Sequence, residues 1–240
     1  MKNRKKIFLV CFIIALNLLY GQDKVGEKEY KKNQEIEKEK EQNDLKGEEK
    51  LYKKMDLKSK ISYDAFKIAV LGYNSIIKND KKLLTIVDFT KPSNEERFFV
   101  LDLEKEEILY ETYVAHGMKS GEMMAQNFSN VRSSNKSSPG FYLTENIYNG
   151  RNGYSMRLEG LEKGINDNAK DRAIVVHGAK YANPTKNGER LGRSFGCLAL
   201  PTEMNQEIVD TIKNGSIIYV HTNNKDYVSK SQFTTLARMI

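Results

Sequence analysis

Short runs of apolar residues, separated by polar breaks, dominate the chain after residue 80. β-branched and aromatic side chains are concentrated in these runs, which is typical of β-strands. We expect strands at residues 83–89, 98–103, 108–114, 140–144, 154–158, 172–177 and 216–221. Because no strand–helix alternation repeats between them, the pattern predicts a mainly β domain of sandwich or barrel-like architecture.

Two segments have helical periodicity instead. In residues 61–78 the apolar side chains of Phe66, Val70 and Tyr73 recur at three- to four-residue spacing, which predicts an amphipathic helix that precedes the strands. A second, short helix is expected at 202–213, directly after Pro201. The long connection 117–140 is rich in Ser, Asn, Gly and Met, and we expect it to face a ligand. A second one, 183–196, contains Gly, Pro and Arg and leads directly into Cys197.

The N-terminus has the pattern of a secretory leader. A basic start is followed by the apolar run 7–16 and by Gly21, so residues 1–22 are predicted to be a signal peptide or an N-terminal membrane anchor. The apolar stretch is about 14 residues, whereas a membrane span needs about 20. Both outcomes predict an exported protein.

Residues 23–60 nearly alternate between Lys and Glu. With 12 Lys and 11 Asp or Glu, and few Leu or Ile, this segment is predicted to be a solvated, partly helical spacer. The folded domain is therefore expected at residues 61–240. With 13 Tyr and 10 Phe, the chain has enough large apolar side chains to build a core.

The formal net charge of +7 does not indicate a nucleic-acid partner. Residues 2–6 supply +4 of it, and residues 61–240 carry a net charge of only +2. A protein that binds phosphate backbones concentrates basic charge on its folded part. We therefore expect no nucleic acid among the partners.

Cys197 is the single thiol outside the leader, so it has no partner for an internal disulfide. Such a thiol is either inert or reactive, and a reactive one needs a neighbouring base, because its unperturbed pKa is about 8.5. His177 ends a predicted strand and is followed by Gly178, while Gly196 directly precedes the cysteine. This arrangement is typical of a Cys–His pair in which glycine allows the backbone amides to face an oxyanion.

Several longer blocks accompany the pair, and together they resemble the L,D-transpeptidases, in particular the murein L,D-transpeptidase subfamily. The resemblance covers residues 61–222 and is carried by Val114–Gly117, Asn127–Asn130, Ser137–Thr144, Gly153–Leu161 and Leu191–Cys197. It implies Cys197 as nucleophile and His177 as general base. It further implies that the Gly178 carbonyl holds the imidazole tautomer, that the Gly196 and Cys197 amides form the oxyanion hole, and that Ser194 orients the loop or contacts substrate.

The activity that the resemblance implies is acyl transfer between peptidoglycan stem peptides. The thiolate attacks the carbonyl of the third residue of a stem tetrapeptide, D-Ala leaves, and an amine of a second stem resolves the thioester. With water as acceptor the same intermediate gives an L,D-carboxypeptidase, and a catalytically silent peptidoglycan-binding module is the remaining alternative. No metal and no cofactor are expected.

The same blocks suggest contacts with substrate. His116 stands in a second His-Gly pair, so it competes with His177 for the role of base. Its motif block otherwise places it in the substrate cleft, and a structural role is the alternative. The other residues predicted to bind substrate are Arg193, Tyr142, Ser129 and Asn130. His221 is expected to be structural. The chain departs from the wider family at Phe195 and at Ala199, where a basic residue or His and an Arg, respectively, are common.

Overall fold

The computed structural model describes residues 47–76 and 81–239 of the chain. The predicted leader and residues 23–46 of the predicted spacer lie outside this part. The described residues form one compact unit that begins at Gly47. In that part of the chain, no helix has the length and apolar character that crossing a membrane requires.

The folded unit begins earlier than the sequence predicted. Helix α3 spans Gly47–Lys54, within the predicted spacer. Met55 and Leu57, which follow it, are buried in the same apolar cluster as Phe66 of the next helix. Residues 47–60 therefore belong to the domain, because their sparse apolar side chains are covered by it.

Helix α4 spans Tyr63–Ser75, inside the range expected from the sequence. Ser62 caps its N-terminus by accepting a hydrogen bond from the Ala65 amide (3.3 Å). Its buried face packs on the sheet, where the ring of Phe141 lies so close to Gly72 that a Cβ there would be 2.1 Å from it.

Eight strands form one sheet in the order β3-β2-β1-β8-β4-β5-β6-β7. They span, in chain order, β1 Leu83–Asp88, β2 Phe98–Asp102, β3 Glu107–Thr112, β4 Gly140–Gly150, β5 Gly153–Gly160, β6 Val175–Gly178, β7 Leu198–Leu200 and β8 Ile217–His221. All seven predicted strands are present, and β7 is the short apolar segment after Cys197. The mainly β prediction is confirmed.

The sheet is nearly closed into a barrel by the chain that leaves β3. Ala115 forms an antiparallel bridge with Ala199 of edge strand β7, and its amide donates to the Ala199 carbonyl (2.8 Å). One residue further on, the His116 carbonyl accepts from the Ser194 amide (2.9 Å). Both edges of the sheet thus meet at the segment that leads into Cys197.

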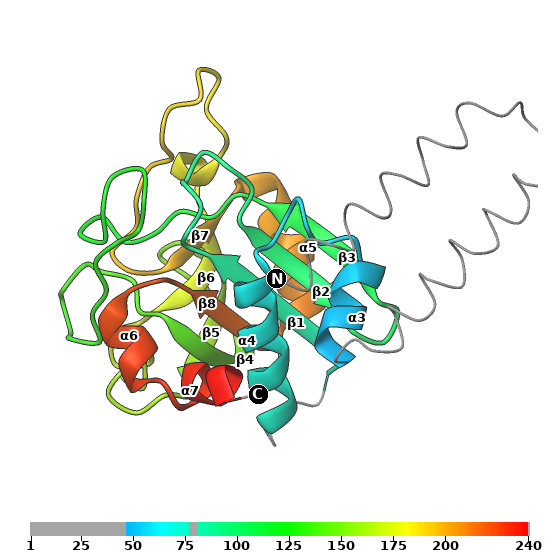
Figure 1. Cartoon of the computed structure of the whole chain (residues 1–240). Helices are drawn as coiled ribbons and strands as arrows, with labels where there is room; N and C mark the ends of the chain where they lie inside the picture. The colour runs from blue at the N-terminus through cyan, green and yellow to red at the C-terminus, as the bar shows by residue number, and fades with distance from the viewer. Residues whose placement is uncertain (1–46, 77–80, 240) are drawn as a thin grey trace, which may run out of the picture. The chain divides into compact units, whose positions relative to one another are not determined.

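Both faces of the central strands are covered, which explains their nearly continuous apolar runs. On one face, Ile208, Val209 and Ile212 of α5 (Thr202–Ile212) pack with Val100 and other strand residues. The opposite face is covered by α3, α4, α6 (Lys225–Lys230) and α7 (Gln232–Met239). Figure 1 shows α4 and α7 in front of the sheet and α5 behind it. A single turn of 3-10 helix, η1 (Lys180–Ala182), follows β6.

Candidate active site

Strands β6 and β7 bring His177 and Cys197 to the same face of the sheet. The two strands are parallel, with Val176 paired with Leu198 and His177 with Ala199. Val176 and Leu198 face the core that α5 covers, so His177 and Ala199 point to the opposite face. Cys197 lies two residues before Ala199, directly before β7, and continued alternation of side chains along the strand would put it on that face. Diagonal neighbours on adjacent strands are about 7–8 Å apart at Cα, within reach of an imidazole and a thiol.

The imidazole of His177 is oriented by the backbone carbonyl of the next residue, Gly178. Its Nδ1 lies 3.1 Å from the Gly178 carbonyl oxygen, which can only accept, so Nδ1 carries the proton and Nε2 is left as a base. The contact expected at Gly178 is thus present. The ring is buried, and burial lowers the pKa of His177 below its ordinary value, with the Gly178 contact opposing the shift. The resting imidazole is neutral near pH 7.

The thiol of Cys197 is 8% exposed and donates to the Ala173 carbonyl at 3.5 Å. Ala173 has a φ of +52°, a conformation that costs a non-glycine residue free energy and turns this carbonyl toward the thiol. Burial raises the pKa of Cys197, while the Val175 amide and the Arg172 guanidinium lower it. Both partners of the pair are therefore uncharged at rest.

Ser194 organises the turn that carries the nucleophile. Its hydroxyl donates to the Cys197 carbonyl (2.7 Å) and accepts from the Gly196 amide (3.1 Å). Of the two roles predicted for Ser194, the orientation of the loop is the one observed. The Gly196 amide is used inside the turn, so the prediction that it serves the oxyanion hole is not supported by this geometry.

Gly196 is required by crowding as well as by backbone conformation. Its φ is +126°, and a Cβ at this position would lie 2.9 Å from the Lys136 carbonyl oxygen. The carbonyl of Gly196 accepts a hydrogen bond from the Ser137 hydroxyl (3.1 Å). That hydroxyl also accepts from the Gly117 amide (2.9 Å). The nucleophile turn is thereby joined to two loops that lie far away in sequence.

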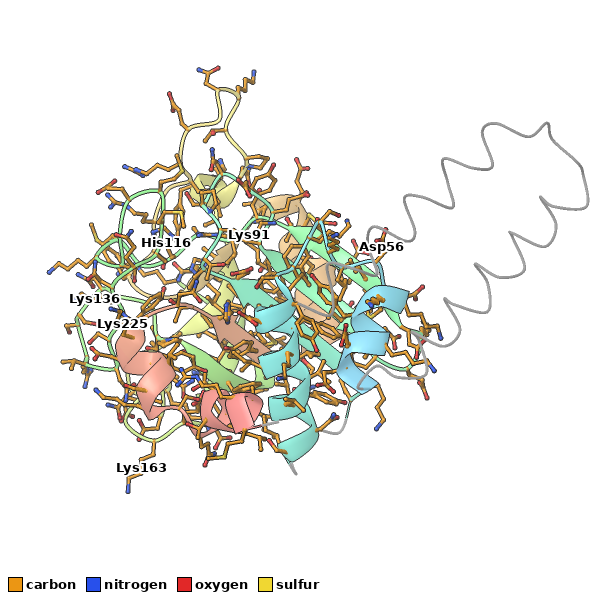
Figure 2. The ribbon with its side chains drawn as sticks, viewed as in Figure 1. Asp56, Lys91, His116, Lys136, Lys163 and Lys225 are labelled. Atoms are coloured by element: carbon orange, nitrogen blue, oxygen red, sulfur yellow. The ribbon has the colours of Figure 1, made fainter. Side chains whose placement is uncertain are left out.

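The structure places His116 away from substrate. The residue has no exposed surface, and the guanidinium of Arg97 donates to its Nδ1 (2.8 Å). Its Nε2 therefore carries the proton and donates to the Gly121 carbonyl (3.2 Å). Burial, with help from Arg97, lowers the pKa of His116 to about 4. Both ring nitrogens of His116 thus have hydrogen-bond partners, whereas Nε2 of His177 is left as a base, which favours His177 for that predicted role. Figure 2 shows His116 among the loops beside the sheet.

Tyr142 is also a core residue rather than a substrate contact. Its ring is 1% exposed within the cluster that α5 covers, and its hydroxyl donates to the Ser138 carbonyl (3.0 Å). Aromatic residues on strands commonly have this role. His221 is buried as expected, with its Nδ1 3.1 Å from the Tyr219 hydroxyl.

The remaining predicted substrate residues hold loops in place. Arg193 donates to the carbonyls of Met118 (3.1 Å) and Gly121 (3.0 Å) and pairs with Glu122 (2.6 Å). The Asn130 amide donates to Asp167 (2.7 Å), and the Ser129 hydroxyl accepts from the Val131 amide (3.1 Å). All three are partly exposed, so their predicted contacts with substrate stay predictions.

Tyr181, on η1, was not predicted from the sequence. Its ring stands edge-on to His177, with ring centroids 6.5 Å apart. The negative charge that Cys197 acquires on ionisation acts on the phenol, and together with burial it raises the pKa of Tyr181 to about 12. A Cβ on Gly192 would lie 2.4 Å from the Tyr181 Cβ, so this glycine permits the ring's position.

An arrangement that holds a metal was not found. In residues 47–76 and 81–239, no group of three or more His, Cys, Asp or Glu side chains is placed to bind an ion. The site consists instead of a thiol, an imidazole and a phenol at the ends of two parallel strands.

Comparison with known proteins agrees with this geometry. The model of the L,D-transpeptidase catalytic domain matches residues 57–221, which is more than half of the chain. No curated protein sequence matches the chain.

Among solved structures, the chain is similar to an L,D-transpeptidase from Mycobacterium smegmatis (14% identity, 59% of each chain covered, TM-score 0.37). It is also similar to the helical cell shape determining protein Pgp2 from Campylobacter jejuni (14% identity, 73% of this chain and 59% of that chain, TM-score 0.43). A third similar structure is an L,D-transpeptidase from Stackebrandtia nassauensis (15% identity, 74% and 77% covered, TM-score 0.36). The match thus spans 59% of the length of the first two proteins. On the family match, this chain belongs to the L,D-transpeptidase catalytic domain family.

Proposed function

We propose that the protein is a peptidoglycan L,D-transpeptidase in which Cys197 forms a thioester with a stem tetrapeptide. The observation that carries this proposal is the parallel pairing of β6, which contains His177, with β7, which directly follows Cys197, together with the contact of His177 Nδ1 with the Gly178 carbonyl that leaves Nε2 as the base. A neutral thiol beside a neutral imidazole can exchange one proton without a metal or a cofactor.

In the proposed reaction, the proton of Sγ passes to Nε2 of His177, and the thiolate attacks the carbonyl carbon of the third stem residue. When the tetrahedral intermediate collapses, the C–N bond to D-Ala breaks and His177 returns the proton to the departing nitrogen. An amine of a second stem then attacks the thioester, His177 accepts its proton, and Cys197 leaves as the thiolate. The product is a cross-link between the third residues of two stems.

Mass spectrometry of the purified protein with disaccharide-tetrapeptide tests this function. We expect an adduct on Cys197, loss of D-Ala and formation of cross-linked dimers. Loss of D-Ala without dimers would identify an L,D-carboxypeptidase. Absence of both the adduct and D-Ala release would refute acyl transfer and favour a silent binding module.

We also propose that the chain is exported and acts on peptidoglycan in the cell envelope. The basic and apolar pattern of residues 1–22 supports this, as does the location of the proposed substrate. Fractionation of cells that express an epitope-tagged chain tests the proposal. Recovery of the tag in the cytoplasmic fraction alone would contradict it.

The pH dependence of the reaction should report His177. Its pKa is lowered by burial, and the neutral ring is the base, so activity is lost only as the pH falls through this lowered pKa. We expect the acid limb of kcat/KM for D-Ala release to have its midpoint below pH 6.5, the ordinary value for histidine. A midpoint at or above 6.5 would contradict the assignment of His177 as the base.

Removing the phenol hydroxyl of Tyr181 should slow the chemical step. We propose that this hydroxyl and the Cys197 amide stabilise the oxyanion, since the ring stands edge-on to His177 and a negative charge on Cys197 raises the pKa of the phenol. Loss of one oxyanion donor typically lowers kcat about 10²–10³-fold. Tyr181→Phe should therefore lower kcat by about 10²-fold with little change in melting temperature.

Tyr63→Phe at the start of α4 is the matched control, because the Tyr63 ring packs edge-on against Tyr52 of α3, with ring centroids 5.2 Å apart, and this variant should leave kcat unchanged. An unchanged kcat in Tyr181→Phe would exclude this role for the phenol.

A further inference from the structure

Arg172 lies in the turn before β6 and is surrounded by groups that the proposed mechanism does not use. It is half-buried, in the segment that the sequence predicted as the beginning of a strand. The structure begins β6 only at Val175, which leaves Arg172 and Ala173 in the preceding turn. Ala173 supplies the carbonyl that accepts the Cys197 thiol proton, so Arg172 is one residue away from a direct contact of the nucleophile.

The guanidinium donates hydrogen bonds to the 129–138 loop, which runs beside the nucleophile turn. Nη1 donates to the Ser129 carbonyl (2.7 Å) and to the Ser138 hydroxyl. Nη2 donates to the Lys136 carbonyl (2.5 Å) and to the Ser134 hydroxyl (3.3 Å). A planar fork that binds four acceptors along one loop fixes the position of that loop more firmly than a single ammonium could. Figure 2 shows the Lys136 side chain at the rim of the molecule.

The same guanidinium also lies against the nucleophile turn itself. Nη2 is 3.4 Å from the point where a Cβ on Gly196 would stand, and the Lys136 carbonyl oxygen is 2.9 Å from that point. Gly196 is the residue before Cys197, so a fixed positive charge lies beside the backbone that carries the thiol. A Cβ on Gly196 would also lie 2.9 Å from Ile174 Cδ1, so a side chain there would have to displace the Lys136 carbonyl or Ile174 and would touch the guanidinium.

One N–H donor of Arg172 has no acceptor in the described part of the chain. Its Nε is buried and has no hydrogen-bond partner among the residues that the structure describes. A buried N–H without a partner costs free energy, and the cost falls when a negative charge develops nearby. Arg172 therefore has capacity to stabilise an anion that is absent in the resting site.

The charged and titratable side chains of the proposed site around Cys197 come from three elements. They are Arg172 from the turn before β6, His177 from β6 and Tyr181 from η1. Of these, Arg172 is the one with a permanent positive charge. His177 becomes positive only after it has taken the thiol proton, and Tyr181 is neutral.

We propose that Arg172 is a positioning residue of the active site: it locks the 129–138 loop against the nucleophile turn and supplies the positive charge that stabilises the Cys197 thiolate. The step it assists is the transfer of the Sγ proton to Nε2 of His177. In this step the S–H bond breaks and an N–H bond forms. This inference rests on the proposed function, because it takes Cys197 as the nucleophile. Its test, however, uses the thiol alone and no peptidoglycan substrate.

The experiment is the pH dependence of alkylation of Cys197 by iodoacetamide, in the full chain with the leader cysteine Cys11 replaced by serine. Two variants separate charge from geometry. Arg172→Gln removes the charge, and we expect alkylation at pH 8 to be about tenfold slower, because one pH unit in the thiol midpoint changes the thiolate fraction tenfold. Arg172→Lys keeps a charge but not the four-acceptor fork, so its midpoint should remain near that of the wild type while its melting temperature falls.

Arg132→Gln is the matched control. Arg132 is an exposed arginine on the 129–138 loop that Arg172 binds, so its substitution removes one positive charge from that loop without touching the nucleophile turn. Its alkylation profile should be that of the parent protein. An unchanged midpoint in folded Arg172→Gln would overturn the proposal and leave Arg172 with a purely structural role.

A second measurement, on the protein with Arg172 intact, tests the proposal even if Arg172→Gln does not fold. The NMR signal of the Arg172 Nε–H should shift with the same pH midpoint as the alkylation rate, and the shift should be lost in Cys197→Ala. A signal that does not titrate would overturn the proposal. A titrating Arg172 in a protein that forms no thioester with tetrapeptide would retain this inference and refute the proposed transpeptidase function.

Discussion

Cys197→Ala is expected to abolish thioester formation and cross-linking while the domain remains folded. The reaction begins with a bond from Sγ to the substrate carbonyl, and alanine has no atom that can form it. Removal of a nucleophile in enzymes of this kind lowers turnover by more than about 10⁴-fold. The structural cost should be small, since the side-chain hydrogen bond that is lost is the one to the Ala173 carbonyl, 3.5 Å long. A sulfur-sized void typically costs about 1 kcal/mol.

The measurement combines intact-protein mass spectrometry with chromatography of the products. Cys197→Ser is the control, because it keeps a hydrogen-bond donor of similar shape but is a much weaker nucleophile with a neutral imidazole as base. Both variants should melt within a few degrees of the wild type. Cross-linked dimers from Cys197→Ala at the wild-type rate would show that another residue is the nucleophile.

Arg97→Met is expected to destabilise the protein by about 3–5 kcal/mol, the range for removing one partner from a buried charged network. Arg97 has no exposed surface. Its Nε and Nη2 donate to the Val114 carbonyl (3.1 and 2.7 Å), and its Nη1 donates to the Lys91 carbonyl (2.9 Å). The guanidinium also lies over the Phe89 ring, 4.9 Å from its centroid. Methionine fills the volume but leaves these carbonyls and the His116 ring without a donor.

Urea denaturation followed by circular dichroism measures this loss of free energy. Arg238→Met on α7 is the control, because Arg238 is exposed and makes one bond to the Val228 carbonyl (3.1 Å), so we expect less than about 0.5 kcal/mol. The loss should also lower activity, since the segment that Arg97 holds continues to His116, whose carbonyl binds the Ser194 amide of the nucleophile turn. An effect of Arg97→Met no larger than that of the control would contradict the buried network.

Local sequence determined the secondary structure and the reacting pair. Runs of β-branched and aromatic residues are sufficient to predict strands, and the helix after Pro201 ends at Ile212, one residue before its predicted end. His177 and Cys197 were identified because each stands beside a glycine at the end of a strand and because the motif blocks resemble one family. The parallel pairing of β6 and β7 then brings them to one face.

The tertiary structure decided which of the motif residues reach the site. His116 and Tyr142 occur in motif blocks as conspicuous as those around Cys197, yet both are buried, because the segment after β3 closes the sheet and α5 covers its core. The start of the domain was predicted too late for a similar reason. A few apolar residues such as Leu57 carry no periodic signal, and only the surface of α4 and the sheet makes them core.

Arg172, Tyr181 and Ser137 were missed because their roles depend on segments that are distant in the chain. Arg172 binds acceptors 34–43 residues earlier, and Ser137 binds the Gly196 carbonyl 59 residues later. Hydrogen bonds of this kind are absent from any local pattern of hydrophobic and polar positions. The sequence by itself therefore determined the strands and the chemistry of the Cys–His pair, whose signals lie within a few residues. The surroundings that tune the pair were decided by tertiary structure, because burial and long-range contacts exist only once the sheet has closed.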